Sequence, residues 1–223
     1  MAERSAFDPK NIIDSTAEKH GLLEELNLPP QVIAFIRTNA RNLQIAVGCL
    51  LVAILAWNFY SQYVEKKENA ATALLAQAMD KSGVDRQATL DEVGQKFSGT
   101  GAAVWGMIEK ANLAADAGNW GEATASYKKA LAELDSSSPI VPLVQLSLAQ
   151  AHENNKEYAE AMTIYQGLSD AAGFKAQALQ GVARVHESQG ELQKAKETYE
   201  GMLADQDLSA RVREEVAQRL AHF

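Results

Sequence analysis

Cysteine is nearly absent from this chain: its 223 residues include one, Cys49, and that residue lies inside an apolar run. A lone thiol leaves the rest of the chain without a disulfide framework, a cysteine metal cage or a thiol nucleophile. A domain without disulfides fits either side of a membrane. This absence therefore excludes types of chemistry and leaves the compartment open.

The motifs of the common enzyme classes are also missing. The sequence has no phosphate-binding P-loop, no glycine fingerprint for dinucleotides, no HExxH pair and no serine elbow with the partners of a catalytic triad. We therefore expect a protein that is not an enzyme and that has no cofactor and no metal site.

Positive charge is scarce beyond residue 60, where 16 lysines and arginines are outnumbered by 23 aspartates and glutamates. The resulting net charge of −7 disfavours nucleic acid as a partner, because binding to phosphates needs basic patches that displace counterions. It also disfavours a broad electrostatic attachment to anionic lipid.

A long apolar run is present, from Leu43 to Tyr60, and its eighteen residues carry no formal charge. As a helix rising about 1.5 Å per residue it would be roughly 27 Å long, close to the hydrocarbon thickness of a bilayer. Trp57, Phe59 and Tyr60 gather at its C-terminal end, where aromatic rings favour the headgroup layer. The run predicts a single transmembrane helix with the working domain on its C-terminal side.

Two other interpretations of the run compete with an anchor. A secretory signal is opposed by the 42 residues that precede the run and by the lack of a clear cleavage site after Trp57. A buried core helix is favoured by Gln44 and Asn58, which shorten the strictly apolar part.

Flanking charges do not orient the run. Two arginines precede it, at positions 37 and 41, and two lysines follow it, at positions 66 and 67. Only lysine and arginine count in the positive-inside rule, so the comparison is a tie.

The segment before the run is polar. Residues 15–18 have capping-box spacing and predict either a short docking helix or, as the alternative, a loosely ordered tail. Pro29 and Pro30 break the chain, and a helix is expected to restart at Gln31 and to run into the membrane.

Beyond the run the sequence predicts helix after helix, without strand alternation. Three stretches align, and each has a turn residue, a large apolar residue two positions on, an alanine three later and a tyrosine four beyond that. They are 118–127, 156–165 and 190–199. The alanines, Ala123, Ala161 and Ala195, are separated by 38 and 34 residues, and the second spacing is the tetratricopeptide period. A serine-rich insertion with Pro139 explains the longer first spacing. These motifs resemble the tetratricopeptide repeat family over residues 102–203.

Earlier in each repeat a second alanine occupies the small-residue position of the first helix, at Ala111, Ala149 and Ala183. His152 and His186 fall at matching places in consecutive repeats, which favours packing between helices over a pair of metal ligands. Trp105 and Trp120 are expected to fill the core or a groove.

The chain is thus predicted to be all-α, with a single N-terminal transmembrane helix followed by a tetratricopeptide-like solenoid. Residues 70–98 suggest a degenerate leading hairpin, and the segment from Leu208 suggests a helix that caps the solenoid. The expected divisions are 1–42 as an N-terminal segment, 43–60 as the membrane helix, 61–101 as a linker helix and leading hairpin, 102–207 as the repeats and 208–223 as the capping helix.

Projection of the repeat register places seven polar residues of the first helices on an inner groove suited to an extended peptide or a partner helix. They are Asn112, Gln150, Glu153, Gln177, Gln180, Arg184 and Glu187. Ordinary solvated helix surface is the competing interpretation for each of them.

A narrower resemblance appears between Phe35 and Tyr60. Phe35, Asn39, Leu43, Ala46-Val47-Gly48, Trp57 and Tyr60, with the alanine-rich helix from Ala70, resemble YfgM-type proteins, which are ancillary subunits of the bacterial SecYEG translocon. The likeness covers residues 31–223 and is diffuse beyond the anchor. This chain departs from the family in its longer N-terminal extension.

The resemblance implies a cytoplasmic N-terminus, one helix in the bacterial inner membrane and a periplasmic repeat domain. It also implies partners: the SecYEG translocon, translocating polypeptides and a membrane-anchored periplasmic chaperone or peptidyl-prolyl isomerase. No catalytic residues are implied.

Two other functions stay open at this point. The same repeats would serve a scaffold for cell-envelope assembly or division, and the list of partners would discriminate it. A single-pass regulatory protein would instead signal through its first 42 residues, and a partner for that segment would favour it.

Overall fold

The computed structural model describes residues 29–171 and 173–223, and every regular element in them is a helix, which confirms the all-α prediction. The predicted capping-box helix at residues 15–18 lies outside the described residues. The chain divides into two units, one ending at Gln62 and the other beginning at Tyr63.

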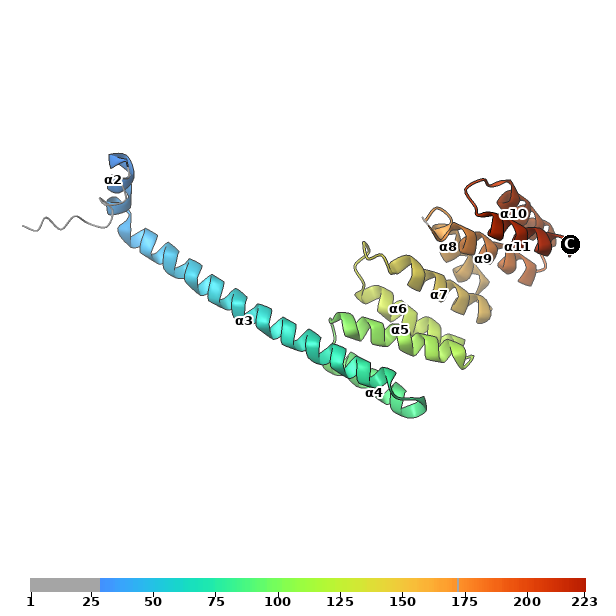
Figure 1. Ribbon diagram of the computed structural model, residues 1–223, viewed down its shortest axis with the longest axis horizontal. Coiled ribbons are helices and arrows are strands. Elements are labelled where there is room, and N and C mark those ends of the chain that lie inside the picture. Colours follow the sequence, from blue (N-terminus) through green and yellow to red (C-terminus); the bar gives the residue numbers. More distant parts are fainter. Residues whose placement is uncertain (1–28, 172) are drawn as a thin grey trace, which may run out of the picture. The chain divides into compact units, whose positions relative to one another are not determined.

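Two helices begin in the first unit (Figure 1). They are α2 (Pro30–Thr38) and α3 (Ala40–Met79). The expected helix from Gln31 into the membrane is therefore interrupted, which corrects the prediction of one continuous run. The break lies at Asn39, whose backbone angles, φ −107° and ψ 16°, depart from helical values, so α2 ends one residue before α3 begins. The side-chain Nδ2 of Asn39 donates to the Phe35 carbonyl at 3.1 Å, beside the ordinary backbone bond.

α3 contains the apolar run. Among the described residues it is the one helix long and apolar enough to cross a membrane, and its apolar window is not buried against other parts of the protein. Leu51 and Trp57 are both exposed, at 56% and 75%. This exposure counts against the core-helix interpretation, because a core helix would bury the same side chains.

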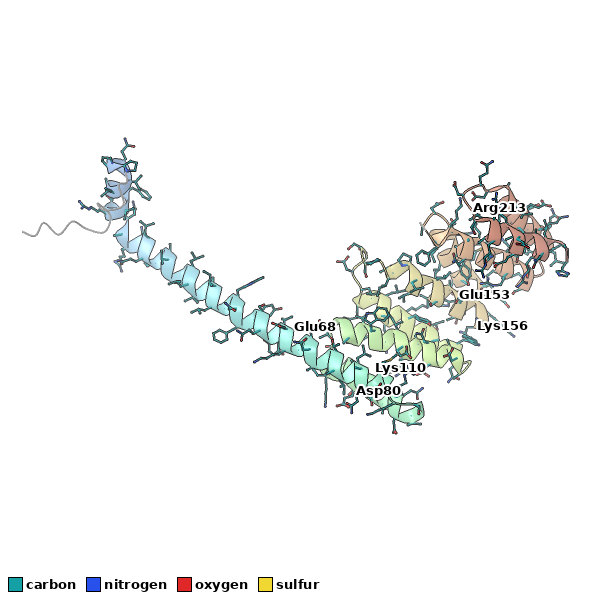
Figure 2. The ribbon with its side chains drawn as sticks, in the orientation of Figure 1. Glu68, Asp80, Lys110, Glu153, Lys156 and Arg213 are labelled. Atoms are coloured by element: carbon teal, nitrogen blue, oxygen red, sulfur yellow. The ribbon has the colours of Figure 1, made fainter. Side chains whose placement is uncertain are left out.

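The second unit is built from the C-terminal part of α3 and eight further helices (Figure 1). They are α4 (Gly83–Lys96), α5 (Gly101–Asp116), α6 (Trp120–Glu133), α7 (Val141–Asn154), α8 (Tyr158–Leu168), α9 (Lys175–Ser188), α10 (Leu192–Ala204) and α11 (Ala210–Leu220). Within this unit, Lys67 of α3 donates to the Ser98 carbonyl at 2.8 Å, and Glu68 (labelled in Figure 2) accepts from the Gly101 N–H at 3.3 Å.

Three helix pairs, α5–α6, α7–α8 and α9–α10, share one turn geometry. Two positions after the last residue of each first helix comes a residue with positive φ: Gly118 (75°), Lys156 (64°) and Gly190 (77°). The N–H groups of this residue and of the next one return to the last carbonyls of the helix; in the second pair, Lys156 N bonds to Glu153 O and Glu157 N to His152 O. This is the Schellman end of a helix, and glycine fits it best because it has no Cβ. The aligned turn residues of the sequence therefore occupy equivalent backbone positions.

The alanines of the repeat pattern are fully buried. All six are 0% exposed: Ala111, Ala123, Ala149, Ala161, Ala183 and Ala195. The aligned tyrosines at 127, 165 and 199 are also buried. Small and large side chains thus interlock where paired helices approach, as expected from the sequence.

Three clusters in series form the core of the three hairpins. The first joins α5, α6 and α7, the second joins α7, α8 and α9, and the third joins α9, α10 and α11. α7 serves two clusters from its two faces, with Val144 and Leu148 in the first and Leu146 and Ala149 in the second. No hairpin buries its apolar surface alone, so neighbouring hairpins must stack.

Candidate protein-binding groove

The seven predicted groove residues lie on the first helices of the three hairpins. Asn112 is on α5, Gln150 and Glu153 are on α7, and the other four are on α9. Asn112, Gln150 and Arg184 each follow a buried alanine by one position, so they are equivalent in the repeat. Figure 2 labels Glu153, between its hairpin and the next.

Three of these residues accept a hydrogen bond from the tyrosine of their own hairpin. Tyr199 donates its hydroxyl to Glu187 at 2.8 Å, and Tyr165 donates to Glu153 at 2.7 Å. In the first hairpin the position equivalent to Glu153 is an alanine, and Tyr127 donates instead to Asn112 at 2.6 Å. Burial raises the pKa of Tyr199 to about 12, so the hydroxyl remains a donor at neutral pH. These side chains therefore hold the hairpin together as well as facing outward.

Arg184 bridges the second and third hairpins. Its Nε and Nη2 donate to the two carboxylate oxygens of Glu153, each at 2.9 Å, and Nη2 also donates to the Tyr165 hydroxyl at 3.2 Å. The hydrogen bond to Glu153 raises the pKa of Arg184, and burial raises that of Tyr165. The fork-shaped pair fixes α9 against α7 and neutralises Glu153. The charge of Glu153 is thus balanced within the groove.

Gln180 and Arg184 lie together beside the last helix. They line a cavity of about 560 Å³ with Tyr199 and one face of α11. That face and the turn after the helix present residues at spacings of three and four: Glu215, Gln218, Arg219 and, in the turn, His222. Sequence reasoning assigned this helix a capping role only, although the spacing was a usable signal of an exposed polar face.

The other predicted residues do not line this cavity, although Glu153 and Glu187 are hydrogen-bonded to two residues that do, Arg184 and Tyr199. Gln177 lines a different hollow, of about 560 Å³, with Lys175 and Asp207, and Glu187 lines a third with Leu192 and Lys196. Gln150 is exposed on α7. Their role in binding stays a prediction.

Two apolar residues occupy the register position of Gln177 but were not among the seven predicted groove residues. Trp105 and Leu143 each lie six residues before the buried alanine of their helix, as Gln177 does. They are 49% and 50% exposed. Of the two placements expected for the tryptophans, Trp105 lines a hollow, whereas Trp120 packs against the first core cluster. Extending the register from Gln177 to the earlier repeats would have found both residues.

The two predicted histidines lie at equivalent turns. Nδ1 of His152, which is buried, is hydrogen-bonded to Glu157, and Nδ1 of His186 to Glu191 at 2.6 Å. The bond to His152 lowers the pKa of Glu157, while Lys194 and then His186 lower that of Glu191. Each pair closes its helix turn, which agrees with a packing role. Within the described ranges no three histidine, cysteine or acidic side chains gather as a metal site.

Comparison with known proteins assigns the family. No curated protein matches the chain. A family model, the tetratricopeptide repeat-like domain, matches residues 34–222, which includes α3 as well as the hairpins. Helical repeats of this kind are typically non-enzymatic scaffolds that bind other proteins. With most of its length matched, the chain belongs to the tetratricopeptide repeat-like domain family.

Proposed function

We propose that this protein is a membrane-tethered scaffold that binds polypeptides and is not an enzyme. The observation that carries the proposal is that some polar residues of the first helices are hydrogen-bonded within the repeats while others are left available to a partner. Glu153, Glu187 and Asn112 are engaged by tyrosines, while Gln150 and Gln177 stay exposed and Gln180 lines a cavity. An amide offers both a donor and an acceptor, which suits the main chain of an extended polypeptide.

The proposed place of action is the exit of the secretion channel in the bacterial inner membrane. Its support is the resemblance of residues 31–223 to YfgM-type proteins, together with α3 as a helix able to cross a membrane. In this proposal the N-terminus is cytoplasmic and the repeats are periplasmic. The partners are the SecYEG translocon, translocating polypeptides and a membrane-anchored chaperone or peptidyl-prolyl isomerase.

Tethering gives such a scaffold a physical advantage. Holding a weak binder beside its clients raises their effective concentration to roughly the millimolar range. Contacts of micromolar affinity are then occupied without additional bonds, and they still release quickly. A groove lined by amides, with its strongest charge pair internally neutralised, fits this kind of brief capture.

Site-specific photo-crosslinking in cells tests the proposal. Probes replace Gln180 in the groove and Leu51 in the anchor, and Ala125 serves as a control because it is exposed on α6, a second helix. Translocon subunits captured at Leu51, with nascent chains or chaperones at Gln180, are the expected result. Envelope-assembly proteins alone at both positions would retain the scaffold and reject the translocon role. Equal capture at Ala125 and Gln180 would reject the groove.

A further inference from the structure

Trp105 and Leu143 form an exposed apolar pair on neighbouring hairpins. They occupy the same repeat position on α5 and α7, and each is about half exposed. The residues next to them, Val104 and Val144, are buried in one shared cluster, which joins α5 and α7 through α6. A large apolar side chain that is repeatedly left in solvent is a feature of binding surfaces.

A hollow of about 330 Å³ adjoins Trp105. Its apolar lining includes Val104, Leu134 and Ile140. Ile140 is the N-cap residue of α7 and lies one turn before Leu143, which is near the hollow along the chain but does not line it. One wall is the connection between α6 and α7, which contains the insertion that lengthens the first repeat spacing.

The charged residues that line this hollow are acidic. Glu133 and Asp135 both line it and are exposed, and the described residues that line it include no lysine or arginine. Asp135 accepts from the backbone N–H and the hydroxyl of Ser137, at 2.7 and 2.6 Å. The hydroxyl's hydrogen bond, reinforced by the backbone one, lowers the pKa of Asp135 and keeps it ionised at neutral pH. An occupant that complements the hollow is therefore apolar with positive charge beside it.

We propose that Trp105, Leu143 and the adjoining hollow are a client-anchoring site for an aromatic or aliphatic side chain flanked by lysine or arginine in an extended polypeptide. The inference rests on the proposed scaffold function, because it names the clients that the repeats hold. The apolar side chain enters the hollow against the indole. The flanking cation lies near Glu133 and Asp135, where the face of Trp105 also attracts it.

Binding of labelled peptides to the full chain in detergent tests the site by fluorescence anisotropy. Three short peptides are compared: Ser-Lys-Phe-Lys-Ser, Ser-Glu-Phe-Glu-Ser and Ser-Lys-Ser-Lys-Ser. We expect the first to bind at least about tenfold more tightly than the other two. Trp105→Ala should weaken it about tenfold, and Trp105→Phe should retain most of the affinity. Glu133→Gln should reduce the preference for lysine over glutamate.

Val84→Ala is the matched control, because Val84 is an exposed apolar residue, 79% exposed, on α4. It should leave the affinity unchanged. The proposal is overturned if wild-type protein binds none of the peptides, if the glutamate peptide binds as tightly as the lysine peptide, or if Trp105→Ala behaves like Val84→Ala. Crosslinking distinguishes failure of this site from failure of the proposed scaffold function. Clients captured at Gln180 and not at Trp105 would reject this site and keep the scaffold, whereas capture at neither position would reject both.

Discussion

Gly181 lies where any side chain would meet a fixed aromatic ring. A Cβ built at this position lies 2.5 Å from Cε1 and Cζ of Tyr165. The ring is fully buried, and its hydroxyl is bonded to both Glu153 and Arg184, so it has little freedom to move. We expect Gly181→Ala to lower the free energy of unfolding by about 1–3 kcal/mol, as overpacking does, measured by urea denaturation.

Gly201→Ala provides the control for this substitution. Gly201 lies within α10, and nothing lies within 4 Å of a Cβ built there. Alanine should stabilise that helix by about 0.5–1 kcal/mol. Equal stability of the two variants would contradict the close contact between Gly181 and Tyr165.

Ionisation of the Glu157 carboxyl makes the stability of the fold depend on pH in the acidic range. Its hydrogen bond with buried His152 lowers its pKa below the ordinary value of 4.5. The folded state thus holds the carboxylate more strongly than the unfolded state does, and this stabilisation is present above pH 4.5. It is lost as the pH falls through the lowered pKa. We expect the melting temperature to fall between about pH 5 and about pH 3.

The same titration on Glu157→Gln isolates this residue. The amide keeps a hydrogen bond to His152 but does not ionise, so the fall in melting temperature should be smaller. Glu160→Gln, at an exposed position on the same helix, should retain the wild-type slope. An unchanged acid slope in Glu157→Gln would show that other carboxylates dominate.

Helices α7 and α9 are linked by a charge pair as well as by packing. Glu153→Gln and Arg184→Gln should each lower the free energy of unfolding by about 1–3 kcal/mol, because each leaves a half-buried partner without its full set of hydrogen bonds. A double-mutant cycle should give a coupling of about 0.5–3 kcal/mol between them. The exposed pair Lys196–Glu200, within one helix and 3.9 Å apart, should couple by less than about 0.5 kcal/mol. Additive effects at the first pair would mean that the bond does not hold the hairpins together.

The helix hairpins were predictable because their signals are local. A turn residue, an alanine and a tyrosine at fixed offsets determine where a helix ends, where two helices approach and what fills the gap. The break at Asn39 was missed because it is a change in the backbone angles of one residue, which has no strong signature in composition.

The candidate site was less predictable because it depends on contacts between repeats. Register reasoning could select Glu153 and Arg184, but it could not show that they bind each other across 31 residues. Whether a polar side chain is free for a partner or engaged by its neighbour depends on the rotation between successive hairpins. Trp105 was expected to fill the core or a groove, but both it and Leu143 were left out of the predicted groove set because only polar residues were projected from the register.

The whole chain depends on α3 for its proposed attachment to a membrane. Arginine at the centre of a transmembrane helix costs about 2.5–3.5 kcal/mol of insertion free energy. Leu51→Arg should therefore increase the fraction of protein released from membranes by alkaline carbonate. Val84→Arg, at a position 79% exposed on α4, should leave that fraction unchanged. Retention of Leu51→Arg at the wild-type level would argue against α3 as the anchor.

Three small cores in series also determine how the repeats open. The clusters contain ten, eight and five buried residues, in chain order, and each is stabilised by its own packing and by the helix that it shares with the next. The third therefore opens at the lowest free energy. Amide protons of α10 and α11 should exchange with deuterated solvent before those of α6 and α8. A polypeptide held beside α11 would then contact the part of the repeat array that opens most often. Binding of that polypeptide would slow hydrogen exchange in α10 and α11.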